Sequence, residues 1–466
     1  MTWRVAVLLG LVALSTAGET QSTIASQISS DALRRSVSSP QIEEIEAQGS
    51  QNGSSQQSPA GAIRLSVKDA EAIALKNNPA ISVARLSALA SQQVTREVRS
   101  NLWPQAYADV TAVDARNNSR ITAGGLNNPV VFTRAAGGAT LSQLITDFGH
   151  TTNLVASARL QAKADEQSAL ATKEDVLLAV DQAFYGALQT HAVLRVAEQT
   201  VASRQLLSDQ VSALTKSKLK SDLDLSFANV NLAQAKLLYL DAVNNDKAAI
   251  ATLSAILGYA SLQNFDLVND SEPLTPPPAD VDPLIAQAFN TRPEIRALEY
   301  ESESSEKLYR ANRDQILPTI SALAAYGDSP VRDDRVFGPY AAAGVNVQIP
   351  IFNGFLFSAK THESDLRSQA ARQRLMDLRN RISRDVRNSW LAATTAFDRV
   401  SVNEQLLAQA NLALDLAQTR YKLGLSSIVE LSQAELQQTQ AEIGSAEAGY
   451  GYRLALSLLR YQTTGL

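Results

Sequence analysis

The residues that most often carry enzyme chemistry are few in this chain and far apart. Cysteine is absent, and the three histidines, His150, His191 and His362, have no second ligand near them at metal-binding spacing. No Gly-x-Ser-x-Gly, His-Glu-x-x-His or phosphate-loop motif occurs. We therefore expect no enzyme, no metal site, no cofactor and no lipid anchor on an N-terminal cysteine.

Two acidic residues stand at matching places, each just after a predicted helix start. Asp224 follows Ser221 by three residues, and Glu430 follows Ser427 by three. Serine, two residues and an acid form the capping box of a helix N-terminus, so both carboxylates are candidate caps. Just before the second box, Lys422 and Gly424 are typical of a helix C-terminus.

Composition favours long helices and disfavours nucleic acid as a partner. The 466 residues include 42 Lys and Arg against 47 Asp and Glu, so the chain has no basic field to hold a phosphate backbone. Proline and glycine are few for this length, with 15 and 21 residues, whereas Ala, Leu, Gln and Ser abound.

The first 17 residues predict export. Arg4 precedes an apolar run over 5–14, and Ser15, Thr16 and Ala17 supply the small residues that a signal peptidase needs. The alternative, an uncleaved membrane anchor, needs about 20 apolar residues, roughly twice this run. Residues 18–62 are polar and lack aromatic residues, so we expect a flexible leader that is dispensable for assembly.

From residue 63 the chain consists of two repeats, predicted as 63–260 and 280–466. Pro79 and Pro104 recur as Pro293 and Pro318, in both cases 214 residues later. Further along, Ala228 and other residues of the first repeat match residues 206 positions later, which places a net loss of eight residues in an intervening loop.

Each repeat predicts the same order of elements. A short helix precedes a proline-initiated one, two strands joined by a hairpin loop follow, and a very long helix then turns into a return helix. The expected helices are 66–77, 79–102, 151–219 and 221–258 in the first repeat, and 282–290, 293–317, 355–423 and 427–464 in the second. The expected strands are 105–113 and 130–145 with the loop 117–129, then 319–322 and 344–349 with the loop 327–338.

Alanine recurs every seventh residue on both return helices, at 228, 235, 242 and 249 and at 434, 441, 448 and 455. A strict heptad keeps one stripe facing a partner helix, and alanine on that stripe lets the backbones come close. An ordinary antiparallel coiled coil would account for one stripe. Stripes in both repeats better fit helices packed side by side in the wall of a tube.

The strands add a hypothesis about assembly. One chain supplies about four two-faced strands, too few to close a barrel. Two chains would give eight strands, whose interior side chains fill, whereas three give twelve and can leave a pore.

These features together resemble the outer membrane efflux protein family, the TolC-like export ducts. The resemblance covers about residues 63–466 and rests on the duplicated order of elements and on five short motifs. The motifs are Leu102-Trp103-Pro104, Ile316-Leu317-Pro318, Asp147-Phe148-Gly149, Phe352-Asn353-Gly354 and Tyr421-Lys422-Leu423-Gly424-Leu425.

The resemblance implies a mainly α fold with a β-barrel part, closed as a trimer. Twelve strands would form a barrel in the lipid of the outer membrane, and a long α-helical barrel would project into the periplasm. Such a passive duct serves tripartite efflux or type I secretion, opened by a periplasmic adaptor and an inner-membrane transporter. The alternative is a periplasmic coiled-coil scaffold or adaptor that never enters the membrane.

The resemblance also implies roles for particular residues. Asp224 and Glu430 would line the periplasmic entrance, where crowded carboxylates attract cations. Tyr421, Gly424, Leu425 and Ser426 would form the tip that contacts the adaptor. This chain departs from well-known members, which carry a second acid where Gln433 stands and a basic residue where Ser426 stands.

Overall fold

The computed structural model describes residues 63–116, 131–269, 273–332, 334 and 338–465. The predicted signal peptide, the leader and the loop 117–129 lie outside these residues, and all described residues belong to one compact unit.

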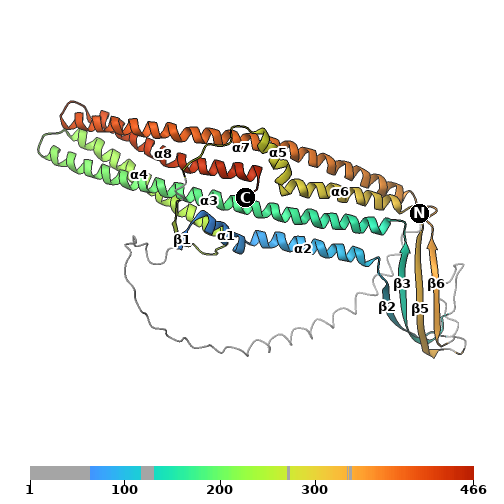
Figure 1. The fold of residues 1–466 in the computed structure, drawn as a ribbon. Helices are drawn as coiled ribbons and strands as arrows, with labels where there is room; N and C mark the ends of the chain where they lie inside the picture. Colours follow the sequence, from blue (N-terminus) through green and yellow to red (C-terminus); the bar gives the residue numbers. More distant parts are fainter. Residues whose placement is uncertain (1–62, 117–130, 270–272, 333, 335–337, 466) are drawn as a thin grey trace, which may run out of the picture. The chain divides into compact units, whose positions relative to one another are not determined.

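The described residues form eight helices, four in each repeat (Figure 1). In the first repeat these are α1 (Val67–Asn77), α2 (Pro79–Ser100), α3 (His150–Lys216) and α4 (Asp222–Ile256). In the second they are α5 (Asp282–Thr291), α6 (Pro293–Asp314), α7 (Leu356–Lys422) and α8 (Ile428–Thr463). Proline begins α2 and α6 as expected, because a residue at the first helical position needs no amide donor.

Four antiparallel strands form one sheet in the order β2-β3-β5-β6. They are β2 (Gln105–Val113), β3 (Arg134–Thr146), β5 (Thr319–Arg332) and β6 (Tyr340–Gln348). The predicted loop 327–338 was wrong over 327–332, because β5 keeps pairing with β3 as far as Arg332 opposite Arg134. That partner satisfies backbone hydrogen bonds where composition alone suggests a loop.

A second, two-stranded sheet was not predicted. It pairs β1 (Ile63–Leu65) in parallel with β4 (Phe265–Leu267). Leu65 is fully buried in a cluster with Phe184 of α3 and Leu253 of α4. The sheet therefore fixes the start of the described chain against the helices of the first repeat.

The helices pack in a consistent pattern. Helix α3 lies against α2, α4, α6 and α8, and α7 lies against α6 and α8. The alanine stripes of the return helices are largely buried: Ala228, Ala235 and Ala242 on α4 and Ala434 and Ala441 on α8 are almost inaccessible. Small side chains thus lie in the seams, as the heptads predicted.

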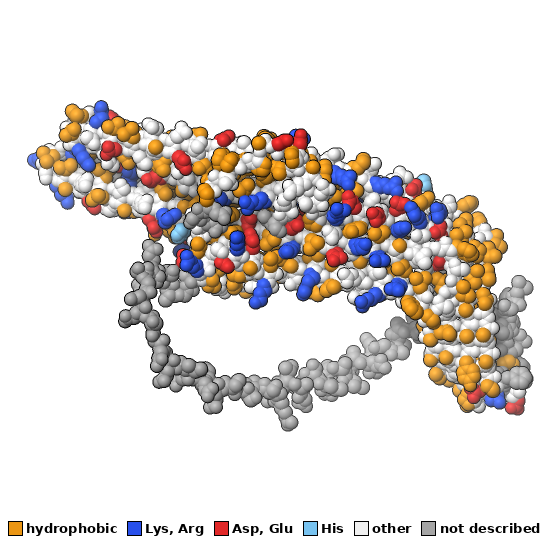
Figure 2. All heavy atoms as spheres, in the orientation of Figure 1, with side chains coloured by type: hydrophobic (Ala, Val, Ile, Leu, Met, Phe, Trp, Pro, Cys, Tyr) orange, Lys and Arg blue, Asp and Glu red, His pale blue; other side chains and the backbone are white. Residues whose placement is uncertain are grey.

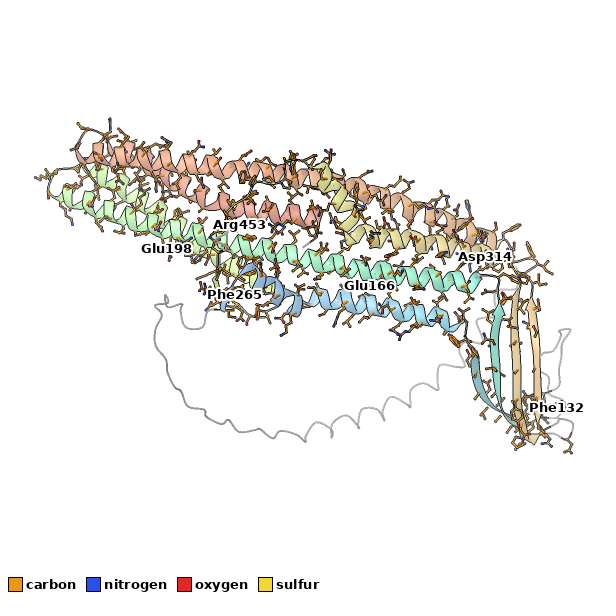
Figure 3. All side chains as sticks on the ribbon, viewed as in Figure 1. Phe132, Glu166, Glu198, Phe265, Asp314 and Arg453 are labelled. Carbon is orange, nitrogen blue, oxygen red and sulfur yellow. The ribbon has the colours of Figure 1, made fainter. Side chains whose placement is uncertain are left out.

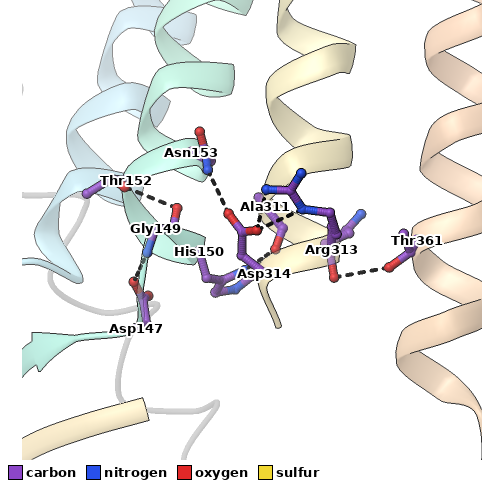
Figure 4. Close-up of polar contacts among 10 residues, drawn as sticks. Asp147, Gly149, His150, Thr152, Asn153, Ala311, Arg313, Asp314 and Thr361 are labelled. Atoms are coloured by element: carbon purple, nitrogen blue, oxygen red, sulfur yellow. Dashed lines mark hydrogen bonds and ion pairs between the residues drawn. The ribbon is translucent and has the colours of Figure 1, made fainter. Parts of the chain in front are cut away.

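A turn joins the sheet to each long helix, and both turns have two consecutive residues with positive φ. They are Phe148 and Gly149 before α3, and Gly354 and Phe355 before α7. Next to the first turn, His150 Nδ1 lies 2.8 Å from the carbonyl oxygen of Ala311, and Asn153 donates to Asp314 at 3.0 Å (Figure 4). These contacts fasten α3 to α6 where the helices leave the sheet.

Within the described residues, none of the helices combines the length and the apolar character needed to cross a membrane.

Candidate functional site

The two turns at the far ends of the long helices are equivalent places in the repeats. Helices α3 and α7 have 67 residues each, and both of their ends are shifted by 206 positions. Gly424 has φ 75° in the second turn, and its equivalent in the first turn, Lys218, has φ 57°. The first turn therefore has the same backbone path without the glycine.

Asp224 forms a complete capping box with Ser221 at the start of α4. Its carboxylate accepts from the backbone N–H of Ser221 at 3.0 Å and from the Ser221 hydroxyl at 2.8 Å. In return the Ser221 hydroxyl accepts from the Asp224 N–H at 3.1 Å. The capping box predicted for this helix start is confirmed.

Glu430 caps through its backbone alone. Its N–H donates to Ser427 Oγ at 3.4 Å, but its carboxylate forms an ion pair with Arg420 of α7, with Oε1 3.0 Å from Nε. The capping box predicted for Glu430 was wrong in this second half, because Arg420 in the last turn of α7 binds the carboxylate. The two acids therefore use their carboxylates differently.

Tyr421 connects the two turns. Its side chain is buried in a cluster that includes Val211 of α3, Ala228 of α4 and Leu431 of α8. The ammonium of Lys220, in the first turn, lies 3.8 Å from the Tyr421 ring centroid, a cation–π contact. Burial, and secondarily the nearby Asp224 charge, raise the pKa of Tyr421. The structure thus brings Asp224, Lys220 and Tyr421 together.

The remaining predicted tip residues differ in exposure. Leu425 is 67% exposed, whereas the Ser426 hydroxyl is buried and has no hydrogen-bond partner among the described residues. The amide of Leu425 donates to the Arg420 carbonyl at 2.8 Å, and the amide of Gly424 donates to the Tyr421 carbonyl at 3.1 Å. These bonds close the α7 terminus and leave the Leu425 side chain free to contact another surface.

Sequence reasoning missed one ion pair near the turns. Arg204 of α3 and Glu435 of α8 are both almost fully buried, with Nη1 2.5 Å from Oε1, and Arg204 also donates to the Glu435 carbonyl at 2.9 Å. Burial lowers the pKa of Arg204 and raises that of Glu435. A signal existed in the repeat, since the positions 206 residues away hold uncharged Ala410 and Asn229.

The four-stranded sheet has one apolar face. Strand pairing puts Val110, Leu141, Ile320, Tyr326, Val345 and Val347 on one side, together with several alanines. The other side carries most of the polar residues, Asp109, Thr140, Ser142, Ser321, Asn346 and Gln348, and also Tyr107, Leu323 and Tyr340. Val110 is 90% exposed, and apolar side chains gather over these strands in Figure 2. An exposed apolar area this continuous is typical of a surface that contacts lipid or protein.

No described residues form a group of three or more His, Cys, Asp or Glu side chains that could hold a metal. His150 contacts Ala311, and His191 Nδ1 lies 3.4 Å from an oxygen of Asp246. His362 lies beside Tyr309 and Arg313 in an open groove between α6 and α7.

A family model described as outer membrane efflux protein matches residues 72–259 and 284–462. The chain belongs to this family. Outer membrane efflux protein BepC of Brucella suis is 25% identical over 67% of this chain and 68% of its own length. Outer membrane protein OprJ of Pseudomonas aeruginosa is 23% identical over 82% and 81%.

Solved structures share the fold of this outer membrane efflux protein. The Campylobacter jejuni CmeC outer membrane channel superposes with a TM-score of 0.76 at 16% identity, over 92% of this chain and 94% of its own. The resemblance inferred from the sequence is confirmed, and with it a location in the outer membrane. Among these related proteins, BepC is an outer membrane efflux protein and CmeC is an outer membrane channel.

Proposed function

We propose that this chain is the passive outer-membrane duct of a tripartite efflux or type I secretion system, and that it works as a homotrimer. The observation that carries the proposal is the four-stranded sheet, which has one apolar face and one face with most of the polar side chains. An apolar face suits contact with lipid, and a polar face suits a water-filled interior. A scaffold confined to the periplasm would have no use for the exposed apolar face.

Strand number and strand edges support three copies. Within the described part of the chain the sheet ends at β2 and β6, whose outer backbone groups can pair with the opposite edge of another copy. Three copies joined in this way give twelve strands, enough for a closed sheet with an open interior. The long helices, α3 and α7 with their return helices, would then line the periplasmic part of the duct.

The helix turns are the proposed contacts with partners. Leu425 and the backbone around Gly424 offer an exposed surface to a periplasmic adaptor. The buried side chain of Tyr421 packs behind that surface. Asp224 and Glu430 would give six carboxylates around the entrance of a trimer. Energy would come from an inner-membrane transporter, since the duct itself performs no chemistry.

A matched pair of substitutions on β6 tests the proposal. Val345→Lys puts a charge on the apolar face, at a cost of about 2–4 kcal/mol per copy if this face meets the middle of the bilayer. Asn346→Lys puts the same charge on the other face of the same strand. We expect outer-membrane trimer, measured by fractionation and heat-modifiable gel migration, to be lost in the first variant and kept in the second. Equal amounts of soluble periplasmic protein for parent and both variants would favour the scaffold.

A further inference from the structure

A polar cavity far from the helix turns is not used by the proposed duct. It has a volume of about 380 Å³ and lies between α1, α3, α8 and residues 273–275. Two acidic side chains line it, Glu71 from α1 and Asp181 from α3. Arg453 of α8, another lining residue, is labelled in Figure 3.

Asp181 is an unusual residue for this position. The residue is almost completely buried, with an exposed fraction of 5%. The hydroxyl of Ser457, on α8, donates to Oδ2 of Asp181. Oδ1 is also buried. No described group donates a hydrogen bond to it unless a neighbouring carboxyl is protonated. A buried carboxylate oxygen without a donor is costly, so this oxygen needs a hydrogen-bond donor.

The side chain that can supply the missing donor is Glu71. Glu71 lines the same cavity as Asp181, and the two carboxyl groups are hydrogen-bond partners there. Two ionised carboxylates offer only acceptors and repel each other, whereas one shared proton turns the contact into a hydrogen bond. We propose that Glu71 and Asp181 bind one proton between them and so form a clasp that holds α1 against α3 and α8.

The charges around the clasp do not remove the need for this proton. Lys68 of α1 faces Glu71, and Arg453 and Arg460 of α8 and the phenols of Tyr185 and Tyr452 also line the cavity. Burial raises the pKa of Glu71, and the Asp181 charge raises it further, while Lys68 lowers it. Burial likewise raises the pKa of Asp181, against smaller opposing effects of Ser457, Glu71 and Arg460. Desolvation therefore outweighs the cations.

The direction of the pH effect follows from these shifts. The folded pair holds a proton that unfolded carboxyls release at their ordinary pKa, 4.5 for Glu71 and 3.8 for Asp181. Between that range and the raised pKa of the pair, the folded chain binds more protons than the unfolded one. The clasp is therefore complete at acidic pH and weakens as pH rises, so α1 becomes less well held.

Glu71→Gln tests the clasp because an amide donates to Asp181 at every pH. We expect hydrogen exchange of the α1 amides in the parent trimer to speed up about tenfold between pH 5.5 and 8.5, after correction for the intrinsic rate. In Glu71→Gln the corrected rate should stay nearly constant. Glu71→Ala, which cannot donate, should exchange quickly at both pH values, which separates lost packing from a lost proton.

Two controls make the outcome decisive. Glu198→Gln makes the same chemical change at an exposed position on α3 (Figure 3) and should follow the parent. Titration of the parent at pH 8.5 with Ca²⁺ or Mg²⁺ should leave exchange unchanged. Parallel pH curves for parent and Glu71→Gln would overturn the proposal, and so would slow exchange restored by the metal and reversed by a chelator. The readout needs folded trimer only, so it does not depend on duct activity.

Discussion

Asp224 and Glu430 occupy the same place in the two repeats, yet their carboxylates have different partners. Asp224 is held by the backbone and hydroxyl of Ser221, and Glu430 pairs with Arg420. The Arg420–Glu430 pair is about half exposed on both sides, so it contributes at most about 1 kcal/mol to stability. Neutralising Glu430 should therefore change the electrostatic potential around the turn much more than the stability of the fold.

The first prediction concerns this pair of acids. We expect Glu430→Gln with Asp224→Asn to lower cation preference in single-channel recordings and to weaken block by multivalent cations from the periplasmic side. Attraction to a ring of carboxylates scales with their number, so the double variant should exceed either single one. Asp209→Asn, at an exposed position farther up α3, is the control. Unchanged selectivity and block in the double variant would leave Asp224 as a cap only.

A second prediction at this scale concerns Glu174 of α3. Burial, with the charge of Glu294 as a smaller cause, raises the pKa of Glu174 to about 7, against its usual 4.5. The pKa of Glu174 is higher in the folded chain than in the unfolded chain, so binding of a proton to Glu174 favours folding. This contribution to stability is complete below about pH 4.5 and is lost as pH rises to about 7.

Glu174→Gln should remove this loss of stability at high pH, because an amide does not ionise. At pH 8 we expect the variant trimer to be more stable than the parent by about 1–2 kcal/mol per copy, allowing for partial exposure, with a smaller difference at pH 5. Thermal unfolding at both pH values measures the effect, and Glu166→Gln on the exposed face of α3 serves as the control. A difference that does not change with pH would contradict the shifted pKa.

Single residues show where sequence reasoning reached its limit. Both capping serines were predictable because a capping box is local in the chain. The partner of Glu430 was not, since it depends on how α7 and α8 meet at their turn. Arg204 and Glu435 lie 231 residues apart, so only the structure, or comparison of the repeats, pairs them.

At the scale of elements, the long helices were the most predictable part. The absence of proline and a sustained helical period indicated α3 and α7, and their ends lie within three residues of those expected. The strands were harder, because β5 continues through a segment rich in Gly, Pro and Asp that pairing with β3 holds in place. The pair β1 and β4 was missed since three residues carry too little periodicity.

The prediction at this scale concerns the alanine stripe of α8. Ala441 is 1% exposed, and a Cβ at nearby Gly444 would lie 2.8 Å from the side-chain atom Oδ1 of Asn403 on α7, so side chains of α7 pack tightly against α8 here. Ala441→Leu should overpack the seam at a cost of about 1–3 kcal/mol per copy, and the half-buried Ala448→Leu should cost less.

Denaturation of the purified trimer measures both effects. Gln437→Leu, exposed on the same helix in the single chain, is the control and should have little effect. If trimer stability were unchanged in both alanine variants, the stripe would not be a packed seam and the tube-wall interpretation would fail.

At the scale of the whole molecule, the duplication explains why a duct can be built from this chain. Each repeat contributes one long helix and two strands of the sheet. The two pairs of strands meet in the middle of the sheet, where β3 pairs with β5. The sequence showed this duplication directly, through prolines and alanines at constant offsets. Alternation within the strands indicated two faces, but the sequence could not show which residues of the four strands share a face, because that requires the register of all four strands.

We propose that three copies close their four-stranded sheets into one twelve-stranded wall in the outer membrane. Electron cryo-microscopy of the particle extracted from outer membranes would show this wall. We expect threefold symmetry, β6 of each copy hydrogen-bonded to β2 of the next, and Val110 and Val345 facing detergent around an open interior. A particle with a single chain or two chains, or with those valines packed inside the sheet, would contradict it.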